Sequence, residues 1–347
     1  MGVKKMKAAV LVDKRNIEIR EVDRPVLKSN EVLIKLKNCG ICTLEQRLFR
    51  GDMKIFYPII LGHEASGVVE EAGEDVLSEF AVGTRVALDM VTRCGECHYC
   101  RTGQSNMCQN RFNKGVRVLG GFGEYVAVKA SQVYPIHDIM SFQEAVFVEP
   151  VSCCIRSLKK IRLDLAEDLL VVGAGPMGLM HLQVARAMGA RVFVSDPDLE
   201  RLKTAAQLGA AVTIDPLNEN IESITKELTD GRGVDACIVT SPAKSALSDA
   251  VNALGKVGRM NIYTSYDDGP ELPIDANTLH RGEYLITGTE GRTPCDFYQA
   301  LRLISFGYVD IKPLISKIVS YSEITEGFEY AMSNSTLRVL LDHEADA

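Results

Sequence analysis

Residues 168–178 read Asp-Leu-Leu-Val-Val-Gly-Ala-Gly-Pro-Met-Gly, and this stretch decides the fold of the chain's second half. An apolar strand at 168–172 leads into the pattern G-x-G-x-x-G, and a helical pattern follows from 176 to 188. In a dinucleotide-binding unit the glycines permit a tight turn, close approach of the pyrophosphate and close packing of helix on strand. The motif predicts these cofactor-binding residues: Gly173, Gly175, Pro176, Met177 and Gly178.

A carboxylate follows the next expected strand, at 191–195. Asp196 lies 21 residues after Gly175 (196 − 175), where an acid grips the adenosine ribose hydroxyls and repels a 2′-phosphate. The position favours NAD over NADP, and Arg201 is expected to flank the adenine. The alternative is that Asp196 only caps the helix that follows Pro197. Thr289, after the last expected strand of this sheet, is also predicted to contact the cofactor.

Strands alternate with helices from residue 168 to 288, which predicts an α/β unit with a doubly wound parallel sheet and right-handed crossovers. The expected strands are 168–172, 191–195, 211–214, 234–240, 259–263 and 284–288, and the expected helices are 176–188, 198–208, 219–228 and 243–254. Segments 259–263 and 276–284 are plausible elements of a subunit interface.

The first part of the chain has a different sequence pattern, in which short runs of alternating apolar residues lie between glycine turns. This pattern predicts a β-rich unit. The expected strands are 31–37, 67–70, 85–88 and 124–128. The tail has an amphipathic helix near 296–305 and strand-like runs at 317–320 and 338–341, so it is expected to pack on the first domain. Three parts are therefore predicted. Residues 1–150 form a β-rich domain, residues 151–288 form a nucleotide-binding domain, and residues 289–347 return to complete the first domain.

Composition narrows the class of protein. The chain has 347 residues and a formal net charge of −7, which disfavours nucleic acid as a partner. No stretch approaches the roughly 20 apolar residues that span a membrane, and no signal peptide is visible. We therefore expect a cytoplasmic protein. In that compartment the ten cysteines favour metal binding or packing over disulfides.

Four cysteines lie at metal-binding spacing, in the pattern C-x2-C-x2-C-x7-C. They are Cys94, Cys97, Cys100 and Cys108. Four thiolates this close in sequence can surround one zinc ion tetrahedrally, which leaves no open position and indicates a structural site. An iron–sulfur cluster also uses four cysteines.

Further candidate ligands are dispersed along the chain. Cys42 follows the strand expected at 31–37, the pair His63-Glu64 follows a glycine, and Glu149 precedes Pro150 at the domain junction. Taken singly, each is unremarkable: a histidine beside glycine is more often a turn or core residue, and a lone cysteine is a small buried hydrophobe.

Together these motifs resemble the zinc-containing medium-chain dehydrogenases, the family of alcohol, sorbitol and threonine dehydrogenases, over essentially the whole chain. The shared motifs are GIC at 40–42, GHEASGVV at 62–69, the four-cysteine segment, GGFGEYVAV at 120–128, VEP at 148–150 and VVGAGPMG at 171–178. The resemblance implies a GroES-like catalytic domain, a Rossmann domain, NAD, one structural zinc and one catalytic zinc per chain. It disfavours an iron–sulfur cluster and suggests a homodimer or homotetramer.

The resemblance also implies the catalytic ligands. Cys42 and His63 match the first two, and Glu64 and Glu149 compete as the third. A glutamate at 149 is typical of polyol dehydrogenases. A zinc ion with an open position lowers the pKa of an alcohol hydroxyl, which prepares the carbon to release hydride to the nicotinamide. The expected substrate is a small-molecule secondary alcohol, and the alternative is an inactive zinc-stabilised binding protein of the same fold.

The sequence departs from the family where a Ser or Thr hydroxyl normally passes the alcohol proton towards solvent. That position is Leu44, which cannot carry a proton, so Thr43, Glu45 or a water held by Glu64 is a candidate relay. Arginines are the other departure. If they line the substrate cleft they favour a sugar acid such as an aldonate, although such side chains are mostly solvated. They are Arg47, Arg117 and Arg292.

Overall fold

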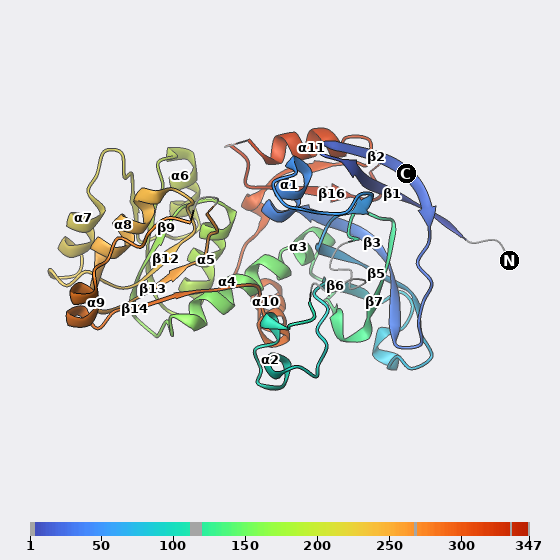
Figure 1. Cartoon of the computed structure of the whole chain (residues 1–347), viewed down its shortest axis with the longest axis horizontal. Helices are drawn as coiled ribbons and strands as arrows, with labels where there is room; N and C mark the ends of the chain where they lie inside the picture. Colours follow the sequence, from blue (N-terminus) through green and yellow to red (C-terminus); the bar gives the residue numbers. More distant parts are fainter. Residues whose placement is uncertain (1–3, 112–119, 267–268, 334, 346–347) are drawn as a thin grey trace. The chain divides into compact units, whose positions relative to one another are not determined.

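The computed structural model describes residues 4–111, 120–266, 269–333 and 335–345. The chain forms two compact units, one of residues 1–149 and 311–347 and the other of residues 150–310 (Figure 1). The second unit thus extends past the expected boundary at 288, and the chain returns at Ile311. The reason is helix α10 (Pro294–Ser305), which buries Phe297 and Ala300 and whose Asp296 is ion-paired at 2.6 Å with Lys159 of the same unit.

The second unit is built on a parallel sheet of six strands, which confirms the doubly wound α/β class. In spatial order the strands are β11 (Val212–Ile214), β10 (Arg191–Ser195), β9 (Asp168–Val172), β12 (Val234–Val239), β13 (Leu254–Ile262) and β14 (Leu285–Gly288). The chain order reverses at β9, and doubly wound sheets bind nucleotides beyond the carboxyl end of the strand at such a reversal.

In the described part of the second unit, seven helices accompany the sheet, among them α10. The others are α4 (Val148–Lys160), α5 (Pro176–Ala187), α6 (Leu199–Gln207), α7 (Ile221–Glu227), α8 (Lys244–Ala253) and α9 (Ala276–Gly282). Every residue of β9 is buried, and Leu170, Phe193 and Leu247 share one apolar core. Strand β13 lies between β12 and β14, and the edge strands of the described sheet are β11 and β14.

The first unit contains two sheets. The smaller has the order β2 (Asn16–Asp23), β1 (Lys5–Asp13), β4 (Ile59–Ile60). The larger has the order β15 (Ile315–Val319), β16 (Arg338–Asp342), β3 (Glu31–Ile41), β5 (Glu64–Ala72), β6 (Arg85–Asp89), β8 (Val133–Pro135), with β7 (Tyr125–Lys129) also paired to β3. Strand β16 runs antiparallel to β3 with Leu341 opposite Cys39 (Figure 1). A strand from the last part of the chain therefore completes a sheet whose other strands, β15 apart, come from the first part.

Short helices connect these strands. They are α1 (Thr43–Arg50), α2 (His98–Arg101), α3 (Phe142–Val146) and α11 (Ile324–Ala331), with single 3₁₀ turns at Ser78–Phe80, Ser105–Met107, Ala130–Gln132 and Lys312–Leu314. Helix α1 starts directly after Cys42, which is its N-cap. It begins there because the Glu45 carboxylate accepts the Cys42 backbone N–H at 3.2 Å in a capping box, and it ends at Gly51, whose φ is 78°. Among the described helices, none combines the length and apolar character needed to cross a membrane.

Candidate functional site

The four cysteines converge in one lobe of the first unit. Their sulfurs all lie within 4.8 Å of one another, and those of Cys94 and Cys108 are 3.6 Å apart. Four sulfurs around a zinc ion with Zn–S bonds of about 2.3 Å are separated by about 3.8 Å, so the donor set fits this ion. The backbone N–H of Cys97 donates to the Cys94 sulfur at 3.3 Å and is the main cause that lowers the pKa of Cys94 to about 6. Backbone hydrogen bonds also lower the pKa of Cys97, whereas burial raises the pKa of Cys100 to about 12, so the thiolate form is favoured at Cys94 and Cys97.

Cys42 and His63 are positioned by the larger sheet of the first unit. Cys42 caps α1 directly after β3, and His63 directly precedes β5, which pairs with β3. His63 is buried, and its Nδ1 lies 2.5 Å from Oε1 of Glu45, which is itself fully buried. A histidine that donates Nδ1–H to a carboxylate presents Nε2 for coordination, so Glu45 orients His63 towards a metal.

Two further carboxylates face this imidazole. Oε1 of Glu149, in the first turn of α4, lies 3.9 Å from Nε2 of His63. Ligand atoms of Cys42, His63 and Glu64 all lie within 4.8 Å of one another. Burial alone lowers the pKa of His63, but Glu45, and more weakly Cys42 and Glu149, raise it well above its ordinary value. This excess of negative charge around one imidazole suits a divalent cation, so the residues fit a zinc ion.

Glu64 is as deeply buried as Glu45. It is 0% exposed, and within the described ranges neither carboxylate oxygen has a hydrogen-bond donor. Oε1 lies 3.2 Å from Nη2 of Arg338, the first residue of β16. Burial is the main cause that raises the pKa of Glu64, while Arg338 opposes it. Arg338 is a residue that the motifs did not reveal, because it comes from the opposite end of the chain.

The candidates for proton transfer and substrate binding are more scattered. Thr43 is exposed at the start of α1, and Leu44 packs against the apolar core of the first unit. Arg47 is half-buried in α1, and Arg292 is buried in the second unit. Arg47 thus belongs to the first unit and Arg292 to the second, and Arg117 lies outside the described residues.

The glycine-rich loop follows β9 and opens α5, as its motif predicts. Gly173 has φ of 109°, and a Cβ at Gly178 would lie 1.8 Å from the Gly173 carbonyl oxygen, so both positions require glycine. At Gly175 the nearest atom to such a Cβ is 4.0 Å away, which leaves the backbone open to a ligand. Pro176 begins the helix, and its neighbour Met177 follows within the first turn, where free N–H groups suit a pyrophosphate. The motif missed Thr240, whose hydroxyl donates to the Gly173 carbonyl at 3.0 Å.

Asp196 is held against this loop. Its Oδ2 accepts the Ala174 N–H at 2.6 Å and its Oδ1 accepts the Asp198 N–H at 2.9 Å. The residue that caps α6 is Asp198, so Asp196 is not the helix cap. Arg201 lies in the first turn of α6. Thr289 follows β14, and its hydroxyl accepts a hydrogen bond from Asn261 Nδ2 at 2.6 Å.

The dinucleotide helix also buries a histidine that has consequences for pH. His181 is fully buried in α5, where its Nδ1–H donates to the Met177 carbonyl at 2.7 Å, and burial lowers its pKa to about 4. An unfolded chain takes up the proton near pH 6.5. The contribution of His181 to the free energy of unfolding is therefore fully present above pH 6.5 and is lost as the pH falls towards 4.

The free energy of unfolding of the wild type should fall between pH 7 and pH 5 as the unfolded chain takes up this proton. Because His181→Leu lacks the proton-binding group, we expect its decrease to be about 2 kcal/mol smaller. Urea titrations of both proteins at the two pH values measure the difference, and any acid release of metal affects both alike. An exposed counterpart, His280→Asn, should follow the wild type. Equal losses in wild type and His181→Leu would contradict the assignment.

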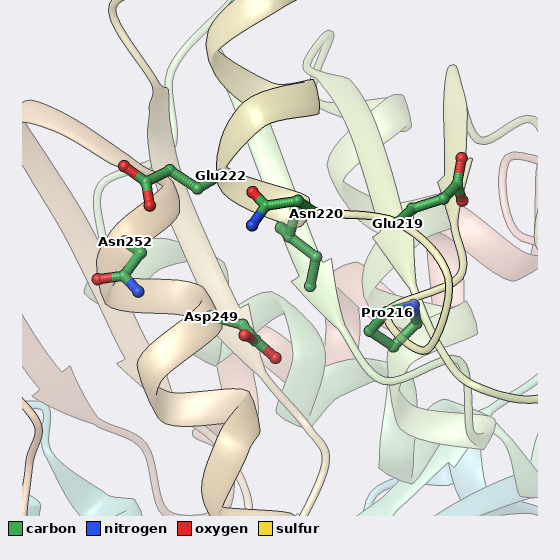
Figure 2. A pocket seen from close by; sticks show the side chains of 7 residues that line it. Pro216, Glu219, Asn220, Glu222, Asp249 and Asn252 are labelled. Carbon is green, nitrogen blue, oxygen red and sulfur yellow. The ribbon is translucent and has the colours of Figure 1, made fainter.

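A pocket of about 150 Å³ lies beside α7 and α8 of the second unit (Figure 2). Its lining residues are Pro216, Glu219, Asn220, Ile221, Glu222, Asp249 and Asn252. Two of its carboxylates already have partners: Glu219 accepts the Asp215 N–H at 2.7 Å, and Glu222 is paired with Lys226 at 2.5 Å. None of the predicted site residues lines it.

Comparisons with known proteins cover both units. Residues 28–138 match the alcohol dehydrogenase GroES-like domain, and residues 176–305 match the zinc-binding dehydrogenase family. The chain is 31% identical to D-arabitol-phosphate dehydrogenase of Enterococcus avium, over 92% of this chain and 91% of that protein.

Solved structures agree with the sequence comparisons. A zinc-binding dehydrogenase from Sinorhizobium meliloti 1021, bound to NADP, has a TM-score of 0.91 at 28% identity and covers 98% of this chain and 100% of that one. An alcohol dehydrogenase from Escherichia coli CFT073, complexed with NADH, has a TM-score of 0.89 at 27% identity. The match covers 99% of this chain and 100% of that one. The chain belongs to the zinc-containing alcohol dehydrogenase family of the medium-chain dehydrogenases, as a zinc-dependent NAD(P) dehydrogenase that acts on CH–OH groups.

Proposed function

We propose that this protein oxidises a secondary alcohol of a polyol or sugar acid to a ketone, with NAD as the hydride acceptor. The observation that carries the proposal is the cluster of Cys42, His63 and two glutamates in the first unit. A zinc ion held there supplies a Lewis acid that lowers the pKa of an alcohol hydroxyl. A glutamate in place of a cysteine at 149 supports a polyol-like substrate by resemblance to polyol dehydrogenases.

The chain's own residues would prepare the reaction by holding groups in place. Glu45 fixes the tautomer of His63 and cannot turn towards solvent, because its two oxygens face the His63 ring and the Cys42 N–H. Glu45 is therefore an orienting residue in this proposal. Thr43 is the exposed hydroxyl of the same segment, and we assign the proton relay to it in place of Leu44.

The nucleotide preference rests on Asp196. Its carboxylate is fixed by the N–H groups of Ala174 and Asp198 at the carboxyl end of β10, where the adenosine ribose binds in this fold. A fixed negative charge there repels a 2′-phosphate, so NAD is the proposed cofactor even though the Sinorhizobium meliloti relative binds NADP.

Assembly and location complete the proposal. The edge strand β14 exposes Leu285, which supports a homodimer or homotetramer formed through this part of the second unit. A cytoplasmic location agrees with the ten cysteines, none of which forms a disulfide within the described chain.

A substrate screen tests the activity. We expect NAD reduction to be fastest with a polyol or an aldonate when polyols, aldonates, sugar phosphates and amino alcohols are compared at equal concentration. The kcat/KM for a polyol and its matching sugar acid then separates the two substrate classes. Reduction with amino alcohols alone would contradict the substrate class, and a protein that binds two zinc ions and NAD but turns over nothing would favour the inactive binding protein.

A further inference from the structure

The carboxyl edge of the parallel sheet carries a threonine on the side away from Asp196. In the sheet register, residues of β9, β12, β13 and β14 lie in line at this edge: Val172, Val239, Ile262 and Gly288. A dinucleotide has its pyrophosphate in the middle. If its adenosine lies at β10, its nicotinamide therefore extends in the opposite direction, over β12, β13 and β14. Thr289 directly follows the last residue of β14, so it lies on the nicotinamide side.

A buried amide next to this edge holds the Thr289 side chain. Asn261 of β13 is 0% exposed, and its Nδ2 donates to Thr289 Oγ1 at 2.6 Å and to the Ser157 carbonyl of α4 at 3.3 Å. A carbonyl oxygen only accepts hydrogen bonds, so the amide nitrogen of Asn261, and not its oxygen, is the atom that faces both partners. Both amide hydrogens are used, which fixes the direction of the Asn261 side chain.

This contact determines what the Thr289 hydroxyl can do. A hydroxyl has one hydrogen to donate and two lone pairs that accept. Because Oγ1 of Thr289 accepts from Asn261, its own hydrogen points away from the amide, and within the described ranges it is donated to no acceptor. Thr289 is half-buried, so a ligand at the edge of the sheet can reach it. The pair therefore presents one directed hydrogen-bond donor to such a ligand.

Packing alone does not explain an amide at position 261. Among the residues that the structure describes, Oδ1 of Asn261 has no hydrogen-bond donor, and a buried polar atom without a partner destabilises a fold. The neighbours in the strand, Met260 and Ile262, are apolar and pack in the core of the unit. An apolar residue at 261 would avoid the penalty, so the bond to Thr289 is the function that the amide serves.

We propose that Asn261 is a positioning residue that directs the Thr289 hydroxyl as a hydrogen-bond donor to the carboxamide oxygen of the nicotinamide. The inference rests on the proposed use of NAD and deepens it. The ribose hydroxyls of the cofactor both donate and accept, so they do not need a directed donor. The carboxamide oxygen only accepts, and it is the atom of the nicotinamide that a fixed donor recognises.

The test compares NAD with thionicotinamide adenine dinucleotide, in which sulfur, a weaker acceptor, replaces only the carboxamide oxygen. We expect isothermal titration calorimetry of the full-length protein to show NAD bound about fivefold more tightly, the effect of one neutral hydrogen bond. In Thr289→Val this preference should fall to about one, because NAD binding weakens while binding of the analogue does not. Thr289→Ser, which keeps the hydroxyl, should retain the preference.

The role of Asn261 has its own variant. Asn261→Leu should lose most of the preference, since nothing then directs the hydroxyl, and Asn261→Leu with Thr289→Val should match Thr289→Val alone. A structural role for Asn261 would weaken binding of both dinucleotides equally. The matched control is Thr287→Val in the same strand, whose hydroxyl donates at 3.4 Å to the Gly288 carbonyl, and it should keep the wild-type preference.

A preference that persists in Thr289→Val overturns the proposal, because it then reflects the larger size of sulfur and not a hydrogen bond. Equal binding of the two dinucleotides by the wild type overturns it as well. The Thr289 variants decide these points even where Asn261→Leu does not fold. A wild-type protein that binds neither dinucleotide overturns the proposed cofactor together with this inference, whereas one that binds NAD with the expected preference and oxidises no alcohol overturns the proposed activity alone.

Discussion

Replacing His63 with asparagine should lower kcat/KM by about 10³ and leave the chain with one metal ion in place of two. The reason is that Nε2 of His63 is the nitrogen presented to the catalytic metal once Nδ1 is bonded to Glu45. Lewis-acid assistance is worth several kcal/mol of transition-state stabilisation, and about 4 kcal/mol corresponds to this factor. Steady-state kinetics and metal analysis on the same preparation measure both effects.

The matched control is His137→Asn, which changes an exposed histidine of the same unit. It should retain both metal ions and wild-type kinetics. If His63→Asn kept two ions per chain and full activity, His63 would not be a ligand. If it lost activity but kept both ions, the imidazole would act on the substrate directly and not through a metal.

Replacing Asp196 with asparagine should reduce the ratio of kcat/KM for NAD to that for NADP by about 10². The amide oxygen can still accept the Ala174 N–H, although the Asp198 N–H loses its acceptor, and the charge that repels a 2′-phosphate is gone. Placing like charges together costs several kcal/mol. A hundredfold change in the cofactor ratio corresponds to about 3 kcal/mol, which is within that cost.

Asp215→Asn is the matched control, because Asp215 follows β11, the neighbouring strand of the same sheet. Its cofactor ratio should equal that of the wild type. A wild-type enzyme that already uses NADP as well as NAD would contradict the role of Asp196, and so would an unchanged ratio in Asp196→Asn.

The sequence predicted the parts of the site that are local in the chain. The glycine-rich loop and the cysteine lobe each lie within a short segment, so spacing alone indicates their geometry. The cluster of Cys42, His63 and Glu149 needed the family resemblance, because these residues meet only through the pairing of β3 with β5 and the start of α4.

Other features were missed for physical reasons. Helix α1 begins with a cysteine in place of the usual Ser, Thr, Asp or Asn cap, so its start signal was weak. The boundary at Ile311 depends on the packing of α10, whose amphipathic pattern does not say which unit it covers. Arg338 approaches Glu64 only because the last strand pairs with β3, and no local pattern encodes such a contact.

The central claim is that a metal ion binds between Cys42, His63 and a glutamate of the first unit. The most direct measurement is a crystal structure of the zinc-loaded protein with anomalous diffraction recorded at the zinc absorption edge. We predict two peaks per chain, one among the four cysteines and one at Cys42 Sγ and His63 Nε2. A single peak in the cysteine lobe, with His63 turned away from Cys42, would contradict the account.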